Sequence, residues 1–428
     1  MLAYVIDAAR EATGGKPIVV YSPATAQICE LFGDDADFAL QHEPRGTGDA
    51  LRAAVAALPG EVDEIVVLSG DVPLIEPASV SRMLHQRREA DAAMALAAVE
   101  RDDPSGYGRV MLADDGSVRR ITEEKDATAD ERANRLINAG LYAFEVAWLR
   151  NTLGRLTPSP ASGELYLTQL VELAADTGRQ ATPVLDADDA DWATEMAGVN
   201  DRADLAEIQL VLQYDILGRH MEAGVAIHDP GSTVIEASVE IAEDVTIESN
   251  VILRGDTRIE RDTVIRSGSQ IIDSTIGERC VVWASVVEGS TVGNDVRIGP
   301  FAHLRAASVV GDGAEIGNFA EQKNTRFGAR SKQHHFSYLG DAEVGEDVNI
   351  GAGTVTANFD GQHKNTTIIG NGAFIGSDTI LRAPVTVGDG AYTGAGSVVT
   401  KDVPPGKLAV GVPARIRERR ITDADPEG

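Results

Sequence analysis

Residues 235–271 read IEASVE-IAEDVT-IESNVI-LRGDTR-IERDTV-IRSGSQ-I, and every sixth residue is Ile or Leu. The same period returns from Val292 to Ile316 and from Ile369 to Val399. A helix repeats every 3.6 residues and a strand every two, so neither explains a period of six. One aliphatic residue pointing inward from each face of a triangular coil does explain it. The stretch therefore predicts a parallel β-helix built from hexapeptide repeats.

The size and charge of the chain limit what else it can be. A length of 428 residues favours two or three domains. The formal net charge of −29 argues against a nucleic-acid partner, because such partners select basic surfaces. No apolar run approaches the ~20 residues of a membrane span. Cys29 and Cys280 are far apart and suggest neither a disulfide framework nor a zinc site. We expect a cytoplasmic protein without membrane partners.

The first part of the chain alternates strand-like and helix-like segments. This rhythm over residues 1–198 predicts an α/β, Rossmann-like domain with a mostly parallel sheet and ligands at the carboxyl ends of its strands. We expect a linker helix within 199–224, the β-helix over 225–403 and a polar tail over 404–428. The expected strands are 18–21, 38–41, 65–68, 93–99, 109–124 and 137–144, and the expected helices are 23–32, 46–58, 77–88 and 201–222.

Four segments of the first domain place glycine or polar residues at strand ends or in the following loops. The turn Gln41–Gly48 opens a helix, and its backbone N–H groups could meet an anion or a base edge, or simply cap the helix. Asp71 follows an aliphatic strand, where it could hold Mg²⁺ against phosphates or cap the next helix. The other segments are Gly106–Arg109 with Glu123–Asp126, and Ile137–Gly140, and Asn200 closes the domain.

The six-residue period breaks near 318–343 and 354–364, and polar residues gather there. Breaks in a regular solenoid commonly carry function. Arg305 and Lys323 are cations in an acidic chain, which suggests a phosphate site. The pair His334-His335 could supply a catalytic base, bind a metal or cap a loop.

The two halves together resemble one family, the bifunctional N-acetylglucosamine-1-phosphate uridylyltransferases / glucosamine-1-phosphate N-acetyltransferases. The resemblance covers nearly the whole chain and includes SGDVP (69–73), GYGR (106–109), RHMEAGV (219–225) and HHFSYLGDAE (334–343). It implies an N-terminally truncated nucleotidyltransferase-like α/β domain followed by a left-handed parallel β-helix.

The resemblance implies uridylyl transfer from UTP to N-acetylglucosamine 1-phosphate in the first domain. The sugar phosphate would attack the α-phosphorus in line, and positioning with charge neutralisation would supply the catalysis. The implied residues are Gln41, Gly46 and Thr47 for uracil, Gly108, Glu123 and Asn138 for the sugar phosphate, and Asp71 with Asn200 for Mg²⁺.

The resemblance also implies acetyl transfer from acetyl-CoA to glucosamine 1-phosphate in the β-helix. His335 would act as general base on the attacking amine, and an imidazole suits that task near neutral pH. Arg305, Lys323, Tyr338 and Asn349 would hold the acceptor, and Asn358, Phe359, Ser377 and Ala395 would line the acetyl-CoA groove. The family's late arginine for the CoA phosphate has no clean counterpart in the closing segment LAVGVPAR (408–415), and Lys407 or Arg415 would substitute for it. The family assembles as homotrimers, with acetyl-CoA bound between neighbouring β-helices.

Several positions depart from the family pattern. The Gly-rich LAAGxGTRM-like loop that wraps the triphosphate is not found before the first helix, so we expect weak UTP binding and little UDP-N-acetylglucosamine. Gln169 replaces an aspartate, His334 a glycine and Phe359 a tyrosine. Two alternatives follow: an acetyltransferase whose first domain is only structural, or a non-catalytic trimeric scaffold or sugar-nucleotide sensor. The complete histidine, cation and amide set argues against the scaffold.

Overall fold

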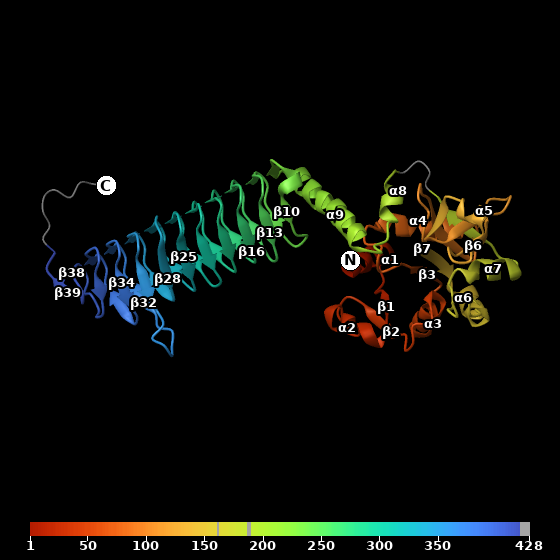
Figure 1. Cartoon of the computed structure of the whole chain (residues 1–428), viewed down its shortest axis with the longest axis horizontal. Coiled ribbons are helices and arrows are strands. Elements are labelled where there is room, and N and C mark those ends of the chain that lie inside the picture. Colours follow the sequence, from red (N-terminus) through yellow and green to blue (C-terminus); the bar gives the residue numbers. More distant parts are fainter. Residues whose placement is uncertain (161, 186–189, 420–428) are drawn as a thin grey trace. The chain divides into compact units, whose positions relative to one another are not determined.

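The computed structural model describes residues 1–160, 162–185 and 190–419 (Figure 1). The chain forms two compact units, residues 1–210 and 211–428. The division falls within helix α9 (Arg202–Glu222), the helix that the sequence predicts at 201–222. Among the described residues, none of the helices has the length and apolar character needed to span a bilayer.

The first unit contains one mixed sheet and one short parallel pair. The larger sheet has the order β6-β5-β7-β4-β8, and β3 pairs with one end of β7. The prediction of a mostly parallel sheet is wrong here. The long strand β7 runs antiparallel to its partners β3, β4 and β5, and β5 runs antiparallel to β6. Among the described residues, β4 and β8 form the only hydrogen-bonded pair of this sheet that is parallel. The strands are β1 (Ile18–Tyr21), β2 (Asp37–Leu40), β3 (Glu64–Val67), β4 (Met94–Glu100), β5 (Arg109–Leu112), β6 (Val118–Thr122), β7 (Leu136–Glu145) and β8 (Ala181–Val184).

Helices α1, α3 and α4 have buried apolar residues, as amphipathic helices on a core require. The helix expected at 23–32 is replaced by a 3₁₀ turn (Pro23–Thr25) and the one-turn α2 (Ile28–Leu31). Neither piece buries a residue, so no tertiary packing supports a longer helix. The helices are α1 (Leu2–Thr13), α3 (Thr47–Ala57), α4 (Pro77–Glu89), α5 (Ala129–Arg132), α6 (Val146–Thr152), the 3₁₀ turn Leu153–Arg155, α7 (Gln169–Asp176) and α8 (Ala190–Glu195).

The second unit is a left-handed β-helix whose coils contribute strands to three sheets (Figure 1). Neighbouring strands in these sheets are parallel, except that the last strand of the third sheet pairs antiparallel with the strand before it. The first sheet comprises β10 (Val234–Ile235), β13 (Ile252–Arg254), β16 (Gln270–Ile272), β19 (Val286–Glu288), β22 (His303–Arg305), β25 (Ala320–Lys323), β28 (Ser337–Gly340), β31 (Val355–Ala357), β34 (Ile380–Arg382) and β37 (Val398–Val399). The second comprises β11 (Glu240–Ile241), β14 (Arg258–Ile259), β17 (Thr275–Ile276), β20 (Thr291–Val292), β23 (Val309–Val310), β26 (Arg326–Phe327), β29 (Ala342–Val344), β32 (Thr367–Ile369) and β35 (Val385–Val387). The third comprises β9 (Ala226–Ile227), β12 (Thr246–Ile247), β15 (Val264–Ile265), β18 (Val281–Val282), β21 (Arg297–Ile298), β24 (Glu315–Ile316), β27 (Lys332–Gln333), β30 (Asn349–Ile350), β33 (Phe374–Ile375), β36 (Tyr392–Thr393), β38 (Leu408–Val410) and β39 (Arg415–Arg417).

The two breaks in the six-residue period have different structural causes. Over 318–343 the coils continue without an extra loop, and Gln322 and Gln333 occupy the inward positions in place of aliphatic residues. Between β31 and β32, in contrast, an insertion leaves the coil (Figure 1). The prediction of a polar tail over 404–428 is wrong for the residues that form β38 and β39. Ala409 of β38 is fully buried, so the core extends by one more strand of the third sheet.

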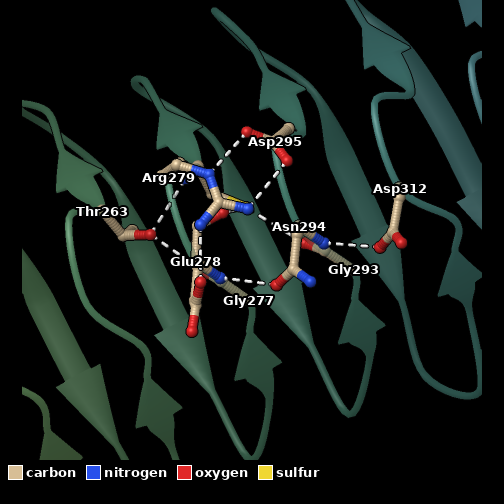
Figure 2. A network of polar contacts seen from close by, with 9 residues as sticks. Thr263, Gly277, Glu278, Arg279, Gly293, Asn294, Asp295 and Asp312 are labelled. Atoms are coloured by element: carbon tan, nitrogen blue, oxygen red, sulfur yellow. Dashed lines mark hydrogen bonds and ion pairs between the residues drawn. The ribbon is translucent and has the colours of Figure 1, made fainter.

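In the turns between the second and third sheets, side chains connect successive coils. A side-chain oxygen of one coil accepts a hydrogen bond from a backbone amide of the preceding coil. Figure 2 shows that Asn294 Oδ1 accepts from the Glu278 amide at 2.8 Å, and Asp312 Oδ1 accepts from the Asn294 amide at 2.7 Å. Arg279 forms two hydrogen bonds to the Asp295 carboxylate, at 2.8 and 3.0 Å. A Cβ at Gly277 would lie 2.5 Å from the Gly293 carbonyl oxygen, so only glycine fits this approach.

Gly277→Ala should therefore destabilise the second unit by about 1–3 kcal/mol, the usual cost of overpacking. Thermal unfolding followed by circular dichroism measures the effect. Gly218→Ala is the matched control, because Gly218 lies inside α9 with no neighbouring atom within 4 Å of an added Cβ. That control should be neutral or slightly more stable. Equal melting temperatures for the two variants would show that the coils relax around the added methyl group without cost.

Candidate functional site

A pocket of about 380 Å³ lies on the β-helix, across the turns that follow successive strands of the third sheet. Four of the residues predicted from the sequence line it together: His335, Asn349, Ser377 and Ala395. The remaining lining residues are His334, Ile350, Gly351, Ala352, Phe374, Gly376 and Thr393. Sequence reasoning assigned no role to Phe374, an exposed aromatic residue whose outward position in a coil could have indicated it.

The two adjacent histidines of the pocket differ in their contacts. His334 Nε2 lies 3.0 Å from Glu315 Oε2. The His335 side chain is exposed, and among the described residues no hydrogen bond reaches its imidazole. The ring of His334 meets it edge-on, with centroids 6.4 Å apart. His335 is therefore the histidine whose ring nitrogens are available to a ligand in the pocket.

A cluster of three cations lies on the coils next to His335. Strand register places Arg305 beside Lys323, and Lys323 beside Gly340. Lys364, on the insertion after β31, lies close to Lys323. The pKa of the Lys323 ammonium falls below its usual value, first because of Lys364 and then because of Arg305. Such crowding of like charges favours an anion, and a phosphate suits it.

A neighbouring carboxylate partly neutralises the positive charge of this cluster. Arg305 Nη1 donates to Glu321 Oε1 at 2.9 Å, with both side chains about two-fifths exposed. Tyr338 is paired in register with Glu321. A Cβ on Gly340 would lie 2.3 Å from the Tyr338 hydroxyl, so that hydroxyl rests against Gly340. The structure thus brings Arg305, Lys323 and Tyr338 to one face of the first sheet. Lys364 could not be assigned from the sequence, because it belongs to an insertion.

The insertion after β31 is a turn organised by Asp360. Its carboxylate accepts from the backbone amides of Gln362 and His363, at 2.8 and 2.7 Å, and these bonds lower the pKa of Asp360. Asn358 Nδ2 donates to Asp341 Oδ2 at 2.5 Å. Phe359 is 62% exposed. Neither Asn358 nor Phe359 lines the pocket of His335 in the single chain.

The two cations considered for the CoA phosphate also differ in their contacts. Lys407 Nζ lies 2.5 Å from Glu418 Oε1 and is partly neutralised. Arg415 begins the exposed edge strand β39. Arg415 is therefore the freer of the two cations for a phosphate.

In the first unit, Gly108, Glu123 and Asn138 converge. The Asn138 amide donates to the Gly108 carbonyl oxygen at 2.8 Å. A Cβ on Gly108 would lie 3.6 Å from Glu123 Oε2 and 3.8 Å from Asn138 Cβ. Asn138 Nδ2 donates to the Tyr142 hydroxyl at 2.7 Å, and Thr168 Oγ1 donates to Glu123 Oε1 at 2.8 Å. These bonds hold both side chains in fixed orientations beside Gly108.

The predicted uracil residues form a closed turn at the start of α3. Gln41 Nε2 donates to the Gly46 carbonyl oxygen at 3.2 Å and to Asp49 Oδ2 at 3.0 Å. Gly46 has a φ of 106°, and a Cβ there would lie 2.6 Å from the Leu165 carbonyl oxygen. Thr47 Oγ1 accepts from the Leu167 amide at 3.0 Å. The turn is thus fixed against the segment 165–167.

Asp71 and Asn200 are also brought close together, because the Val199 amide donates to the Asp71 carbonyl oxygen at 2.9 Å. Both side chains are exposed. In the part of the chain that the structure describes, no three His, Cys, Asp or Glu side chains form a metal-binding group. One carboxylate and one amide oxygen nevertheless fit Mg²⁺, which commonly takes its other ligands from phosphates and water.

Comparison with known proteins gives two family matches. Residues 1–193 match the nucleotidyl transferase family, and residues 289–321 and 366–401 match the bacterial transferase hexapeptide family. The bifunctional protein GlmU of Rubrobacter xylanophilus is 47% identical over 417 residues, covering 97% of this chain and 87% of that protein. The GlmU proteins of Trichlorobacter lovleyi (42%) and Bacillus velezensis (40%) match 96% and 99% of this chain, and 89% and 91% of their own lengths.

Proposed function

The chain belongs to the GlmU family of bifunctional proteins, and on that premise we propose the substrates of its two units. The second unit transfers the acetyl group of acetyl-CoA to glucosamine 1-phosphate. The first unit transfers a uridylyl group from UTP to the resulting N-acetylglucosamine 1-phosphate. The observation that carries this proposal is the pairing, on one β-helix, of a pocket containing the free imidazole of His335 with the cations Arg305, Lys323 and Lys364.

In acetyl transfer, His335 takes a proton from the 2-amino group of the sugar as its nitrogen attacks the thioester carbonyl carbon. The N–C bond forms, the C–S bond breaks, and the proton passes to the departing CoA sulfur. Arg305, Lys323 and Tyr338 hold the sugar phosphate, with Asn349 beside the reacting centre. Ser377 and Ala395 line the path of acetyl-CoA in the same pocket. Asn358 and Phe359 approach the cofactor from the insertion.

In uridylyl transfer, Gln41, Gly46 and Thr47 hold the uracil. Gly108, Glu123 and Asn138 hold the N-acetylglucosamine phosphate, and their mutual contacts support a preformed site. Asp71 and Asn200 would hold Mg²⁺, which when bound neutralises phosphate charge.

We also propose a homotrimer in which a neighbouring β-helix completes the acetyl-CoA site. The pocket of His335 is formed by surface turns of a single solenoid. Beside it, Phe301, Phe319 and Phe336 occupy the turns of consecutive coils and are 58%, 63% and 58% exposed. The rings of Phe301 and Phe319 are stacked, with centroids 5.4 Å apart. A column of exposed phenyl rings next to the site supports contact with a second copy.

The proposal predicts different metal requirements for the two activities. Acetylation of glucosamine 1-phosphate should be unaffected by EDTA, because its residues act through a proton and fixed charges. Uridylyl transfer should be lost with EDTA, restored by Mg²⁺ and lost again in Asp71→Asn. Thiol release from acetyl-CoA and pyrophosphate release from UTP measure the two reactions. Acetyl transfer that depends on Mg²⁺, or no acetyl transfer at all, would contradict the proposal.

A further inference from the structure

Two glutamines stand inside the β-helix where neighbouring coils carry aliphatic residues. Gln322 of β25 is paired in register with Leu304 on one side and Leu339 on the other. Gln333 of β27 is paired with Ile316 and Ile350. Both glutamine side chains are completely buried. A buried amide is unfavourable unless it is hydrogen-bonded, and an aliphatic residue would fit the pattern of the solenoid.

The two amides belong to a hydrogen-bond chain that ends at the proposed catalytic base. Gln322 Nε2 donates to Gln333 Oε1 at 2.8 Å, and Gln333 Nε2 donates to Ser337 Oγ at 2.9 Å. The Ser337 hydroxyl donates in turn to the His335 carbonyl oxygen at 2.8 Å. All three donors point the same way, so each bond strengthens the next. Ser337 is also buried, with an exposed fraction of 9%.

The hydrogen-bond chain leaves one of its own polar atoms without a hydrogen-bond partner. Among the described residues, Gln322 Oε1 is buried without a hydrogen-bond partner. Two aliphatic residues would avoid this unpaired acceptor, so stability alone does not explain the pair. The imidazole of His335, in contrast, receives no hydrogen bond among the described residues. Its position therefore depends on its backbone, and the Ser337 hydroxyl fixes one atom of that backbone.

We propose that Gln322, Gln333 and Ser337 are positioning residues that hold the His335 peptide, and through it the imidazole, in the orientation required for acetyl transfer. The inference rests on the proposed role of His335. A base must lie within hydrogen-bond reach of the proton that it removes, so a small displacement of its backbone lowers turnover without changing substrate affinity.

The first test replaces both glutamines with the residue type of their neighbours, as Gln322→Leu/Gln333→Leu. Removing both partners leaves no new unpaired group, and the apolar core becomes continuous. The melting temperature should be unchanged or higher. The kcat for acetyl transfer should fall on the order of 10-fold to 100-fold, with the KM values of both substrates within about threefold. Unchanged kcat in this folded variant would overturn the proposal, because a purely structural pair predicts that result.

The second test uses two serines with the same local geometry. Ser285 Oγ donates to the carbonyl oxygen two residues earlier, at Trp283, as Ser337 Oγ does at His335. Ser285 is buried and lies three coils before the site. Ser337→Ala should lower kcat, Ser337→Thr should restore it, and Ser285→Ala should leave it unchanged. Equal kcat values for Ser337→Ala and Ser285→Ala would overturn the proposal even if the double glutamine variant failed to fold.

His335→Ala, assayed in parallel, separates the role of the base from the role of the positioning chain. If His335→Ala loses acetyl transfer while the glutamine and serine variants keep an unchanged kcat, the proposed role of the positioning chain is wrong and the role of His335 as base stands. If it keeps normal acetyl transfer, His335 is not the base, and both the proposed role and the positioning chain are overturned.

Discussion

His335→Ala should lower the kcat for acetyl transfer by a factor on the order of 10² to 10⁴, the usual contribution of a positioned general base. His335 is the histidine of the pocket whose imidazole is exposed and without a hydrogen bond among the described residues. The exposed side chain adds little to the core, so the variant should fold normally. Thiol release from acetyl-CoA with glucosamine 1-phosphate as acceptor measures the effect.

His334→Ala is the matched control for this experiment. His334 lies in the same pocket and turn, but its Nε2 is 3.0 Å from the Glu315 carboxylate. Its removal should change kcat by at most a few-fold, below the contribution of a base. A larger loss in His334→Ala than in His335→Ala would reverse the assignment of the base. A loss in both variants accompanied by a lower melting temperature would trace the effect to the turn itself.

The β-helix could be predicted from the sequence because aliphatic side chains at a six-residue spacing have one simple structural explanation. The spacing disappears where the inward residue is polar, as at Gln322 and Gln333, although the coil continues there. It also changes at shortened turns, such as the five-residue step from Ile271 to Ile276, both fully buried. In such places the backbone pairing between coils maintains the fold without the aliphatic signal.

The first unit shows what local periodicity omits. Most of its strands can be located from the sequence. The pairing of β7 with β3, β4 and β5, in contrast, joins distant segments, and no local pattern contains it. The candidate site follows the same rule. Arg305 and Lys323 are one coil apart, and strand register makes them neighbours. Lys364 approaches Lys323 only because an insertion carries it there, so its role emerges from the structure.

Arg305→Ala and Lys323→Ala should each raise the KM for glucosamine 1-phosphate about 10-fold to 100-fold, the range expected for one charge-assisted hydrogen bond to phosphate. The KM for acetyl-CoA should change much less, because both residues lie on strands of the first sheet and neither lines the pocket. Lys332→Ala is the matched control. Lys332 is a nearby exposed cation, but it lies on the third sheet, 3.7 Å from Glu315. An increase confined to acetyl-CoA would assign the cluster to the other substrate.

The pH dependence of the KM for glucosamine 1-phosphate tests whether the cations Arg305, Lys323 and Lys364 act together. The protonated ammonium of Lys323 is the form that holds the phosphate of the acceptor. In the protein without bound substrate, the pKa of Lys323 lies below that of an ordinary lysine because of Lys364 and then Arg305. The KM for the sugar phosphate should therefore begin to rise at a lower pH than for an isolated lysine. Lys364→Ala removes the largest cause of the shift, so the rise should move to higher pH even though one cation is lost. A rise at the same pH in both proteins would mean that Lys323 and Lys364 do not share one phosphate site.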